Sequence, residues 1–173
     1  ATFGGLNFME FFEDERVIIN PIRLKSRIIR EFHSSITLFN LGTSRKSANI
    51  ILDQNKSLEK ESRSLDAMHS IKQSAINMKE QLISGNILNV SKILADSWES
   101  KKRLTKRISN SQINHIHNQA ILAGADAGKI SGAGGGGVMF FLSDPTKKIS
   151  IIQAMKRNNV EFINFEFVNS GCF

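Results

Sequence analysis

Five of the twelve glycines in this chain of 173 residues fall within six consecutive positions, residues 132–137. Glycine disfavours an ordered backbone by up to about 1 kcal/mol relative to alanine, so such a run is expected where the chain needs a positive φ or a close approach. The apolar residues Val138–Leu142 come directly after it and are typical of a buried strand. The glycine run therefore predicts either a wide turn between two strands or a loop whose backbone comes close to a ligand.

Two common phosphate loops are excluded by the residues on the C-terminal side of the glycine run. Gly132, Gly134 and Gly137 match Gly-x-Gly-x-x-Gly, but a dinucleotide fingerprint leads from a strand into a helix, whose N-terminus holds the pyrophosphate. Here the run leads into a strand. It also lacks a subsequent Gly-Lys-Ser/Thr, so the segment is not a Walker A loop. A different loop that grips phosphate through its amides stays open as an interpretation beside the plain turn.

Alternating apolar residues predict a β-rich beginning. Residues 6–12 and 17–19 flank the acidic turn 13–15 and are typical of a β-hairpin, and residues 35–41 favour a third strand. We read the first 41 residues as extended structure.

Helical periodicity takes over from residue 44. The expected helices are a short one at residues 47–54, a long amphipathic one that contains Leu65 and Leu82 and ends at Gly85, one with Val90, Leu94 and Trp98 on one row, and one that starts at a capping box of Ser109 and Gln112 and stops at Gly124.

The end of the chain returns to strands. Residues 127–131 and 138–142 are expected to be strands, Asp144 and Pro145 to open a helix through about residue 157, and the alternating residues 163–167 to form a final half-buried strand. This order predicts an α+β fold, an antiparallel sheet with helices packed on one face.

Composition narrows the classes of partner. The 23 Lys and Arg residues exceed the 16 Asp and Glu residues, a formal net charge of +7, so nucleotides, sugar phosphates, nucleic acid or an acidic membrane surface suit the chain. Apolar runs fall far short of the ~20 residues of a membrane helix. Cys172 is the only cysteine, which excludes an internal disulfide and a zinc cluster and favours a reducing, cytoplasmic setting.

The glycine run and its surroundings resemble a known family. Residues 129–137, Lys-Ile-Ser-Gly-Ala-Gly-Gly-Gly-Gly, resemble the third conserved motif of the GHMP kinases, the superfamily of galactokinase, homoserine kinase, mevalonate kinase and phosphomevalonate kinase. Residues 1–11 are similar to the segment after the catalytic Asp in the sugar-kinase branch. Residues 42–48, 98–102 and 124–132 resemble the bacterial D-glycero-D-manno-heptose 7-phosphate kinases.

The resemblance implies a fold and a division of the chain. Residues 43–173 are expected to form a GHMP kinase C-terminal domain, a ferredoxin-like layered antiparallel sheet with helices. Residues 1–42 are expected to be the β-rich tail of the N-terminal kinase domain. The family's Gly-Leu-Gly-Ser-Ser phosphate loop occurs nowhere in the chain, and its catalytic Asp would precede Ala1, so we expect a C-terminal half that is inactive alone.

The activity implied for the parent protein is transfer of the γ-phosphoryl group of ATP to a sugar or sugar phosphate. The expected acceptor is D-glycero-D-manno-heptose 7-phosphate, with the 1,7-bisphosphate as product. ATP and Mg²⁺ are expected to bind mainly in the N-terminal half, and no catalytic residue or metal ligand is assigned within this chain.

Twelve residues are expected to bind substrate or phosphate. They are Thr2, Gly4, Gly5, Arg45, Lys102, Lys129, Ser131, Gly132, Ala133, Gly134, Gly135 and Gly136. Arg45 precedes a helix start, where a guanidinium and amides hold phosphate jointly, and is the best candidate for the phosphate of the substrate. Lys102 comes after Trp98 on one helix row and either reaches the cleft or snorkels at the helix end. Lys129 is either an ammonium directed at phosphate or a solvated strand lysine.

Two alternatives stay open at this point. The acceptor in a GHMP kinase could be another sugar, such as fucose or galactose. The basic residues 101–107 and the net charge also suit a non-enzymatic nucleic-acid-binding α+β module. That module is disfavoured, because cations at a helix end complement the dipole and no stacking aromatics are interleaved with the basic residues. We therefore expect neither a nucleic-acid nor a membrane partner.

Overall fold

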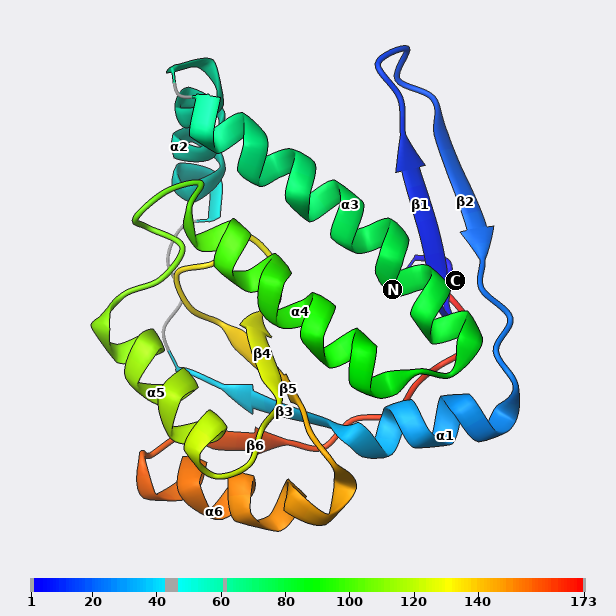
Figure 1. Ribbon diagram of the computed structural model, residues 1–173, viewed down its shortest axis with the longest axis vertical. Coiled ribbons are helices and arrows are strands. Elements are labelled where there is room, and N and C mark those ends of the chain that lie inside the picture. Colours follow the sequence, from blue (N-terminus) through cyan, green and yellow to red (C-terminus); the bar gives the residue numbers. More distant parts are fainter. Residues whose placement is uncertain (1, 43–46, 61, 173) are drawn as a thin grey trace.

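The computed structural model describes residues 2–42, 47–60 and 62–172 of the chain. Its elements are β1 (Asn7–Phe11), β2 (Val17–Pro21), α1 (Ser26–Ser35), β3 (Ile36–Asn40), α2 (Ser47–Lys60), α3 (Ser62–Ser84), α4 (Ile87–Lys102), α5 (Ser111–Leu122), β4 (Ala127–Ile130), β5 (Val138–Leu142), a 3₁₀ turn η1 (Pro145–Lys147), α6 (Lys148–Arg157) and β6 (Glu161–Ile163) (Figure 1). The predicted hairpin, the strand near 36–40 and the helices of the middle are confirmed.

Four strands form the main sheet in the order β4-β5-β3-β6, and every neighbouring pair is antiparallel. Taken along the chain, strand β3, the helices α2–α5, strands β4 and β5, helix α6 and strand β6 make a β-α-β-β-α-β arrangement of the ferredoxin-like type. The predicted α+β fold with a layered antiparallel sheet is therefore confirmed. Strands β1 and β2 form a separate two-stranded antiparallel sheet.

Helices cover both faces of the main sheet, whereas the sequence pattern predicted helices on one face. Side chains alternate between the two faces of a strand. Phe39, Met139 and Phe141 on one face share a core with apolar residues of α5 and α6. Ile36 and Leu142 on the other face pack with apolar residues of α3 and α4. Figure 1 shows the sheet between the long pair α3 and α4 and the helix α6.

Helix α1 departs from the extended structure predicted for the first 41 residues. Ile28 and Ile29 are adjacent β-branched residues, a type with a lowered helix propensity. Ile28 is buried in the structure, and its side chain lies against the backbone of Gly85 at the end of α3. Helix propensity alone does not stabilise so short a helix, so tertiary packing decides the conformation of this segment.

Two further boundaries differ from their predictions. Strand β6 ends at Ile163, and the alternating Phe165 and Phe167 lie beyond it, where both rings contact the ring of His33 from α1. Their spacing therefore reflects packing on a helix and not strand pairing. Helix α5 is capped by Asn110, whose side chain accepts a hydrogen bond of 2.9 Å from the amide of Ile113; Ser109 is not the cap.

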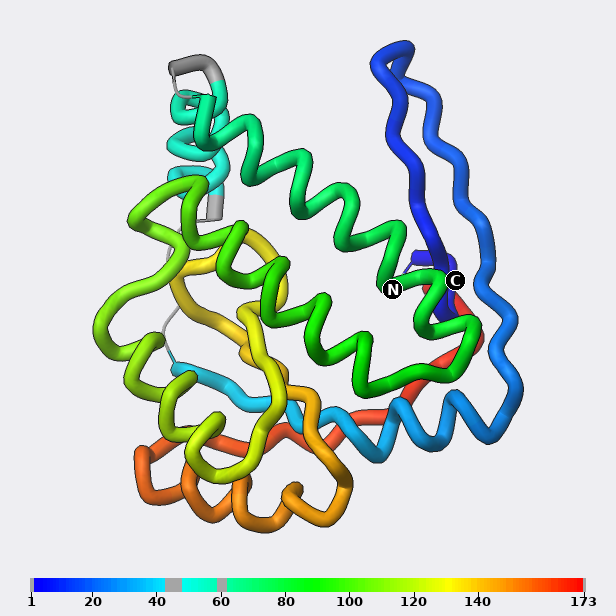
Figure 2. Tube along the Cα trace, viewed as in Figure 1, coloured from blue at the N-terminus to red at the C-terminus, as the bar shows by residue number. Residues whose placement is uncertain are grey.

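The two ends of the described chain lie side by side (Figure 2). The amide of Gly5 donates to the carbonyl of Val168 at 2.7 Å. The division predicted at residue 42 stays a prediction, although β3, which precedes it, lies between β5 and β6 in the main sheet. Within the described residues, the helices are too short or too polar to cross a membrane.

Candidate functional site

The glycine loop, residues 132–137, joins β4 to β5 and is tied to three other parts of the molecule. The amide of Gly135 donates to the carbonyl of Ile108 at 2.8 Å, and the carbonyl of Gly137 accepts from Leu41 at 2.9 Å. The side chain of Gln54 in α2 donates to the carbonyl of Ala133 at 3.3 Å. The loop is thus a wide, fixed connection and not a two-residue hairpin turn.

One glycine of the loop is required by a close approach. Gly134 has a φ of +112°, and a Cβ placed on it would lie 3.0 Å from the Cα of Ile108. Ile108 is fully buried between α4 and α5, so it has little space in which to retreat. The glycine loop therefore rests directly on the backbone of that connection.

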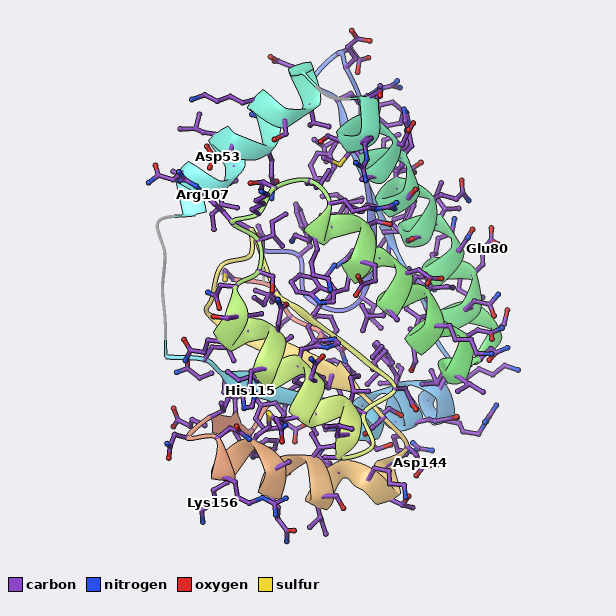
Figure 3. The ribbon with its side chains drawn as sticks, turned by 60° about the vertical axis from the view of Figure 1, so that its left-hand side comes forward. Asp53, Glu80, Arg107, His115, Asp144 and Lys156 are labelled. Atoms are coloured by element: carbon purple, nitrogen blue, oxygen red, sulfur yellow. The ribbon has the colours of Figure 1, made fainter. Side chains whose placement is uncertain are left out.

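An ion pair with helix α2 supports the connection between α4 and α5. The Asp53 carboxylate in α2 and the Arg107 guanidinium, next to Ile108, are 2.7 Å apart, and Figure 3 shows the two residues close together. Helix α2 therefore supports the loop twice, directly through Gln54 and indirectly through Arg107.

Most amides of the loop have no acceptor among the residues that the structure describes. Among the described residues, Gly135 is the only member of 132–137 whose amide donates to a protein atom. Gly134 to Gly136 all have positive φ, and a turn conformation of this kind can present backbone amides to an anion. The loop can therefore offer several donors to a phosphate.

A cavity of about 300 Å³, called the lysine cavity below, lies beside the first residues of the loop, between α3, α4 and β4. Its walls are mostly apolar, and its polar end carries two amines, from Lys101 of α4 and Lys129 of β4. The Lys101 ammonium also donates to the carbonyl of Gly132. The remaining lining residues are Ile71, Ser74, Ala75, Met78, Leu94, Ser97, Ile130, Ser131, Gly132 and Phe140.

Both amines of the lysine cavity are easier to deprotonate than ordinary lysines. Burial, and after it the charge of Lys129, lowers the pKa of Lys101 to about 8. Burial also lowers the pKa of Lys129. Loss of hydration and a like charge both disfavour an ammonium, so an anion bound between the two would stabilise their charged forms.

Three of the residues predicted from sequence meet at the lysine cavity. Lys129, Ser131 and Gly132 line it, and Lys129 is half-buried, unlike a solvated strand lysine. Ala133, Gly134, Gly135 and Gly136 continue the loop toward Ile108 and Gln54. These seven positions lie within one continuous stretch of the chain, residues 129–136.

The other predicted residues lie elsewhere. Lys102 pairs with Glu99 in its own helix at 2.7 Å, and its ammonium lies 5.9 Å from the ring centroid of Trp98, so it does not line the lysine cavity. Arg45 lies outside the described residues. Thr2 is exposed next to Gly171 at the other end of the chain. The role of each in binding stays a prediction.

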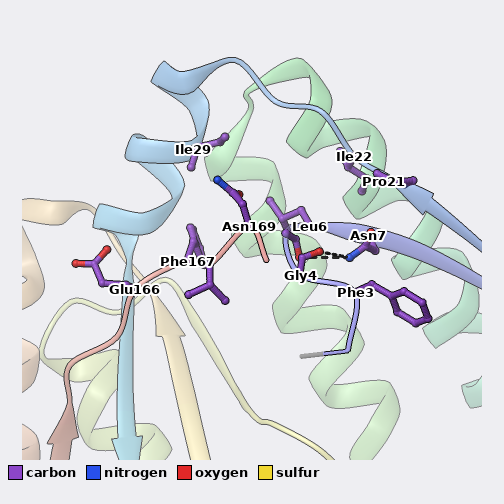
Figure 4. A pocket seen from close by; sticks show the side chains of 12 residues that line it. Phe3, Gly4, Leu6, Asn7, Pro21, Ile22, Ile29, Glu166, Phe167 and Asn169 are labelled. Carbon is purple, nitrogen blue, oxygen red and sulfur yellow. Dashed lines mark hydrogen bonds between the residues drawn. The ribbon is translucent and has the colours of Figure 1, made fainter. Parts of the chain in front are cut away.

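Gly4 and Gly5 line a second cavity, of about 560 Å³ (Figure 4). It lies between the start of the chain, the base of the hairpin, α1 and residues 166–169. A Cβ on Gly4 would lie 2.5 Å from the carbonyl oxygen of Asn169, so this glycine lets the two ends of the chain touch. The two glycine-rich segments thus belong to separate cavities.

Lys101 is the site residue that sequence reasoning missed. The apolar pattern favoured the row of Trp98 and Lys102, neither of which lines the lysine cavity. Leu94, Ser97 and Lys101, at steps of three and four, make the neighbouring row, and all three line it. The burial of Leu94 and Ser97, which only the structure reveals, places Lys101 at the cavity, so no signal in the sequence singled it out.

Comparison with known proteins identifies the domain. Residues 78–161 match the family described as GHMP kinases C terminal. The chain is 43% identical over 171 residues to a D-glycero-alpha-D-manno-heptose 7-phosphate kinase of Campylobacter jejuni, an alignment that spans 99% of this chain and 50% of that protein.

Solved structures agree with this comparison. A putative sugar kinase from Campylobacter jejuni has a TM-score of 0.72 and 41% identity, over 98% of this chain and 47% of its own. A D-glycero-D-manno-heptose 1-phosphate kinase from Bacteroides thetaiotaomicron has a TM-score of 0.70 and 32% identity, over 98% of this chain and 44% of its own. The L. major mevalonate kinase shares the fold, with a TM-score of 0.78 at 14% identity.

The chain spans about half the length of the relatives it matches. Within that half, the sequence identity and the structural similarity both extend over nearly all of this chain. Residues 78–161 therefore match the GHMP kinase C-terminal domain, and the chain is similar over nearly its whole length to half of a heptose phosphate kinase.

Proposed function

We propose that the chain is the C-terminal half of an ATP-dependent sugar kinase whose acceptor is D-glycero-D-manno-heptose 7-phosphate and whose product is the 1,7-bisphosphate. The observation that carries this proposal is the 43% identity, over 99% of the chain, to a relative named as a kinase of that substrate. A structural relative is named as a heptose 1-phosphate kinase. The position of the phosphate on the acceptor is therefore the first point to test.

The glycine loop supports the proposal physically. Phosphoryl transfer depends mainly on positioning the reactants and on stabilising the charge of the transferred group. A loop that is anchored on Ile108, and whose other amides have no acceptor among the described residues, can bind a phosphate with little rearrangement. We assign the loop and the neighbouring Lys129 and Ser131 to binding of the phosphorylated substrates.

This chain offers groups that could bind the phosphates of ATP, but the described residues offer no site for Mg²⁺. The loop amides suit the phosphates of a nucleotide, but the described residues bring together no group of three side chains that could hold a metal ion. We therefore assign the ligands of Mg²⁺, and most contacts with ATP, to the rest of the protein. Mg²⁺ would neutralise the phosphates, and this chain would contribute the orientation of the acceptor.

We also propose that the β1–β2 hairpin, within the predicted segment 1–42, belongs to the N-terminal kinase domain, because it forms a sheet of its own. Arg45 stays our candidate for contact with the phosphate of the acceptor. The exposed free thiol of Cys172 suits a reducing compartment, and we place the kinase in the cytoplasm.

The test is the acceptor specificity of the intact protein that contains this chain. ADP release would be measured with heptose 7-phosphate, heptose 1-phosphate, galactose and fucose at equal concentration. We expect the highest kcat/KM with the 7-phosphate and no turnover by residues 1–173 alone. A higher kcat/KM with the 1-phosphate or with an unphosphorylated sugar would show that the proposed acceptor is wrong. Absence of turnover with all four sugars would contradict the proposed sugar kinase activity.

A further inference from the structure

The lysine cavity brings together two amines from different elements. Lys101 ends the row of Leu94 and Ser97 on α4, and that row faces β4. Lys129 lies opposite Phe140 in the β4–β5 ladder, on the sheet face that α3 and α4 cover. The side chains of a helix and a strand thus enter the cavity at the same end, next to the start of the glycine loop.

Their charges are not compensated by the protein. No described carboxylate forms an ion pair with either amine. The cavity lining contains no Asp or Glu from α3, α4, β4 or β5. Two half-buried ammonium groups in one cavity repel each other and lose hydration, a costly arrangement that an anion between them would relieve.

We propose that Lys101 and Lys129 bind the phosphoryl group that the acceptor sugar already carries, an inference that rests on the proposed function and extends it. A phosphate monoester carries a charge of about −1.5 to −2 near neutral pH, which matches two ammonium groups. A nucleotide phosphate would bring Mg²⁺, and Mg²⁺ commonly takes one or two carboxylates, which this lining lacks.

A structural role is the competing explanation for Lys101. Its ammonium donates to the carbonyl of Gly132 and lies in the last turn of α4, where a cation complements the helix dipole. That role concerns the shape of the loop and would affect every substrate alike. Lys129 lies in a strand, so a role at a helix end does not apply to it. If both lysines bind phosphate, both substitutions should therefore have similar effects, whereas a structural role would affect Lys101 alone.

The kinetic test uses the intact protein with Lys101→Gln, Lys129→Gln and the double variant. Lys92→Gln is the matched control, because Lys92 is an exposed lysine on the same helix. A hydrogen bond to a charged group contributes enough for about a 10- to 100-fold rise in KM for the sugar phosphate per lost amine. The KM for ATP should stay within about twofold, and Lys101→Arg should recover part of the loss.

The outcomes separate the explanations. A rise in the KM for ATP instead would assign the amines to the nucleotide. An equal loss of kcat with all acceptors, at unchanged KM, would show the structural role of Lys101. Unchanged kinetics in the double variant would refute the subsite.

A second measurement does not depend on turnover. Acetylation of individual lysines in the intact protein would be monitored by mass spectrometry at pH 8, with inorganic phosphate as the probe. We expect phosphate to slow acetylation of Lys101 and Lys129 severalfold and to leave Lys92 unchanged. If phosphate protects the two lysines but the protein turns over no sugar, the anion site stands and the proposed kinase activity and acceptor are both wrong. If the protein turns over the sugar phosphate but phosphate gives no protection, only the proposed anion site is wrong.

Discussion

Replacement of Gly134 by alanine tests whether the glycine loop is held by its approach to the buried Ile108. The new Cβ would lie 3.0 Å from the Cα of Ile108 and 3.1 Å from its carbonyl oxygen, whereas carbon atoms in contact are ordinarily about 3.5–4.0 Å apart. Overpacking of this kind costs about 1–3 kcal/mol. The φ of +112° adds about 1–3 kcal/mol of backbone strain for any residue with a Cβ.

Gly132→Ala separates these two costs. Gly132 also has a positive φ, of +87°, but a Cβ there would meet nothing within 4 Å. We therefore expect Gly134→Ala to lower the free energy of unfolding by about 1–3 kcal/mol more than Gly132→Ala. For a urea dependence of about 2 kcal/mol per M, that is a further fall of about 0.5–1.5 M in the midpoint.

The assay is urea unfolding monitored by the fluorescence of Trp98. This residue is buried in the same core cluster as Ile108 and is the only tryptophan of the chain. Equal midpoints for the two variants would refute the reasoning, because they would show that Ile108 moves aside without cost.

Three further outcomes are expected. Gly128→Ala places a Cβ 2.2 Å from the ring of Phe141 and should lower the free energy of unfolding by about 1–3 kcal/mol, less in a Phe141→Leu background; strict additivity in a double-mutant cycle contradicts this. Asn110→Ala removes the N-cap of α5 and should lower the free energy of unfolding in urea by about 1 kcal/mol. An unchanged urea midpoint would show that Asn110 does not stabilise the helix as its cap. Because the unfolded chain binds protons at Lys101 and Lys129 more tightly than the folded chain does, stability should rise from pH 8 toward 10.5. A double Lys→Met variant should lose this rise, and an identical pH profile in that variant would show that the two amines titrate normally.

The parts of the fold that sequence predicted are those with a strong local period. The row of Val90, Leu94 and Trp98 defined α4 because its burial repeats with the helical turn, and Val138–Leu142 was a strand because it is apolar throughout. Helix α1 was missed because its adjacent isoleucines are β-branched and no side-chain cap marks its start, whereas its conformation depends on contacts with Gly85, Phe165 and Phe167, which are distant in sequence.

The candidate site was predicted in part for a similar reason. The glycine loop can be recognised in the sequence, because the positive φ angles that it needs are provided by glycines at neighbouring positions. Lys101 and Lys102 are neighbours with identical side chains, and which of them faces the loop depends on how α4 is rotated against β4. That rotation is set by packing across the sheet, so the sequence alone could not distinguish the two.

The position of β3 in the main sheet bears on how the chain acquires its structure. Strand β3 pairs Ile36 with Leu142 on one side and Leu38 with Ile163 on the other, so this central strand must wait for partner strands that are made long after it. Pairing between such distant segments slows folding, because a long loop must close before any contact is gained. During synthesis, β3 would lack both of its strand neighbours until β5 and β6 emerge, and an unpaired strand is prone to aggregation in that interval.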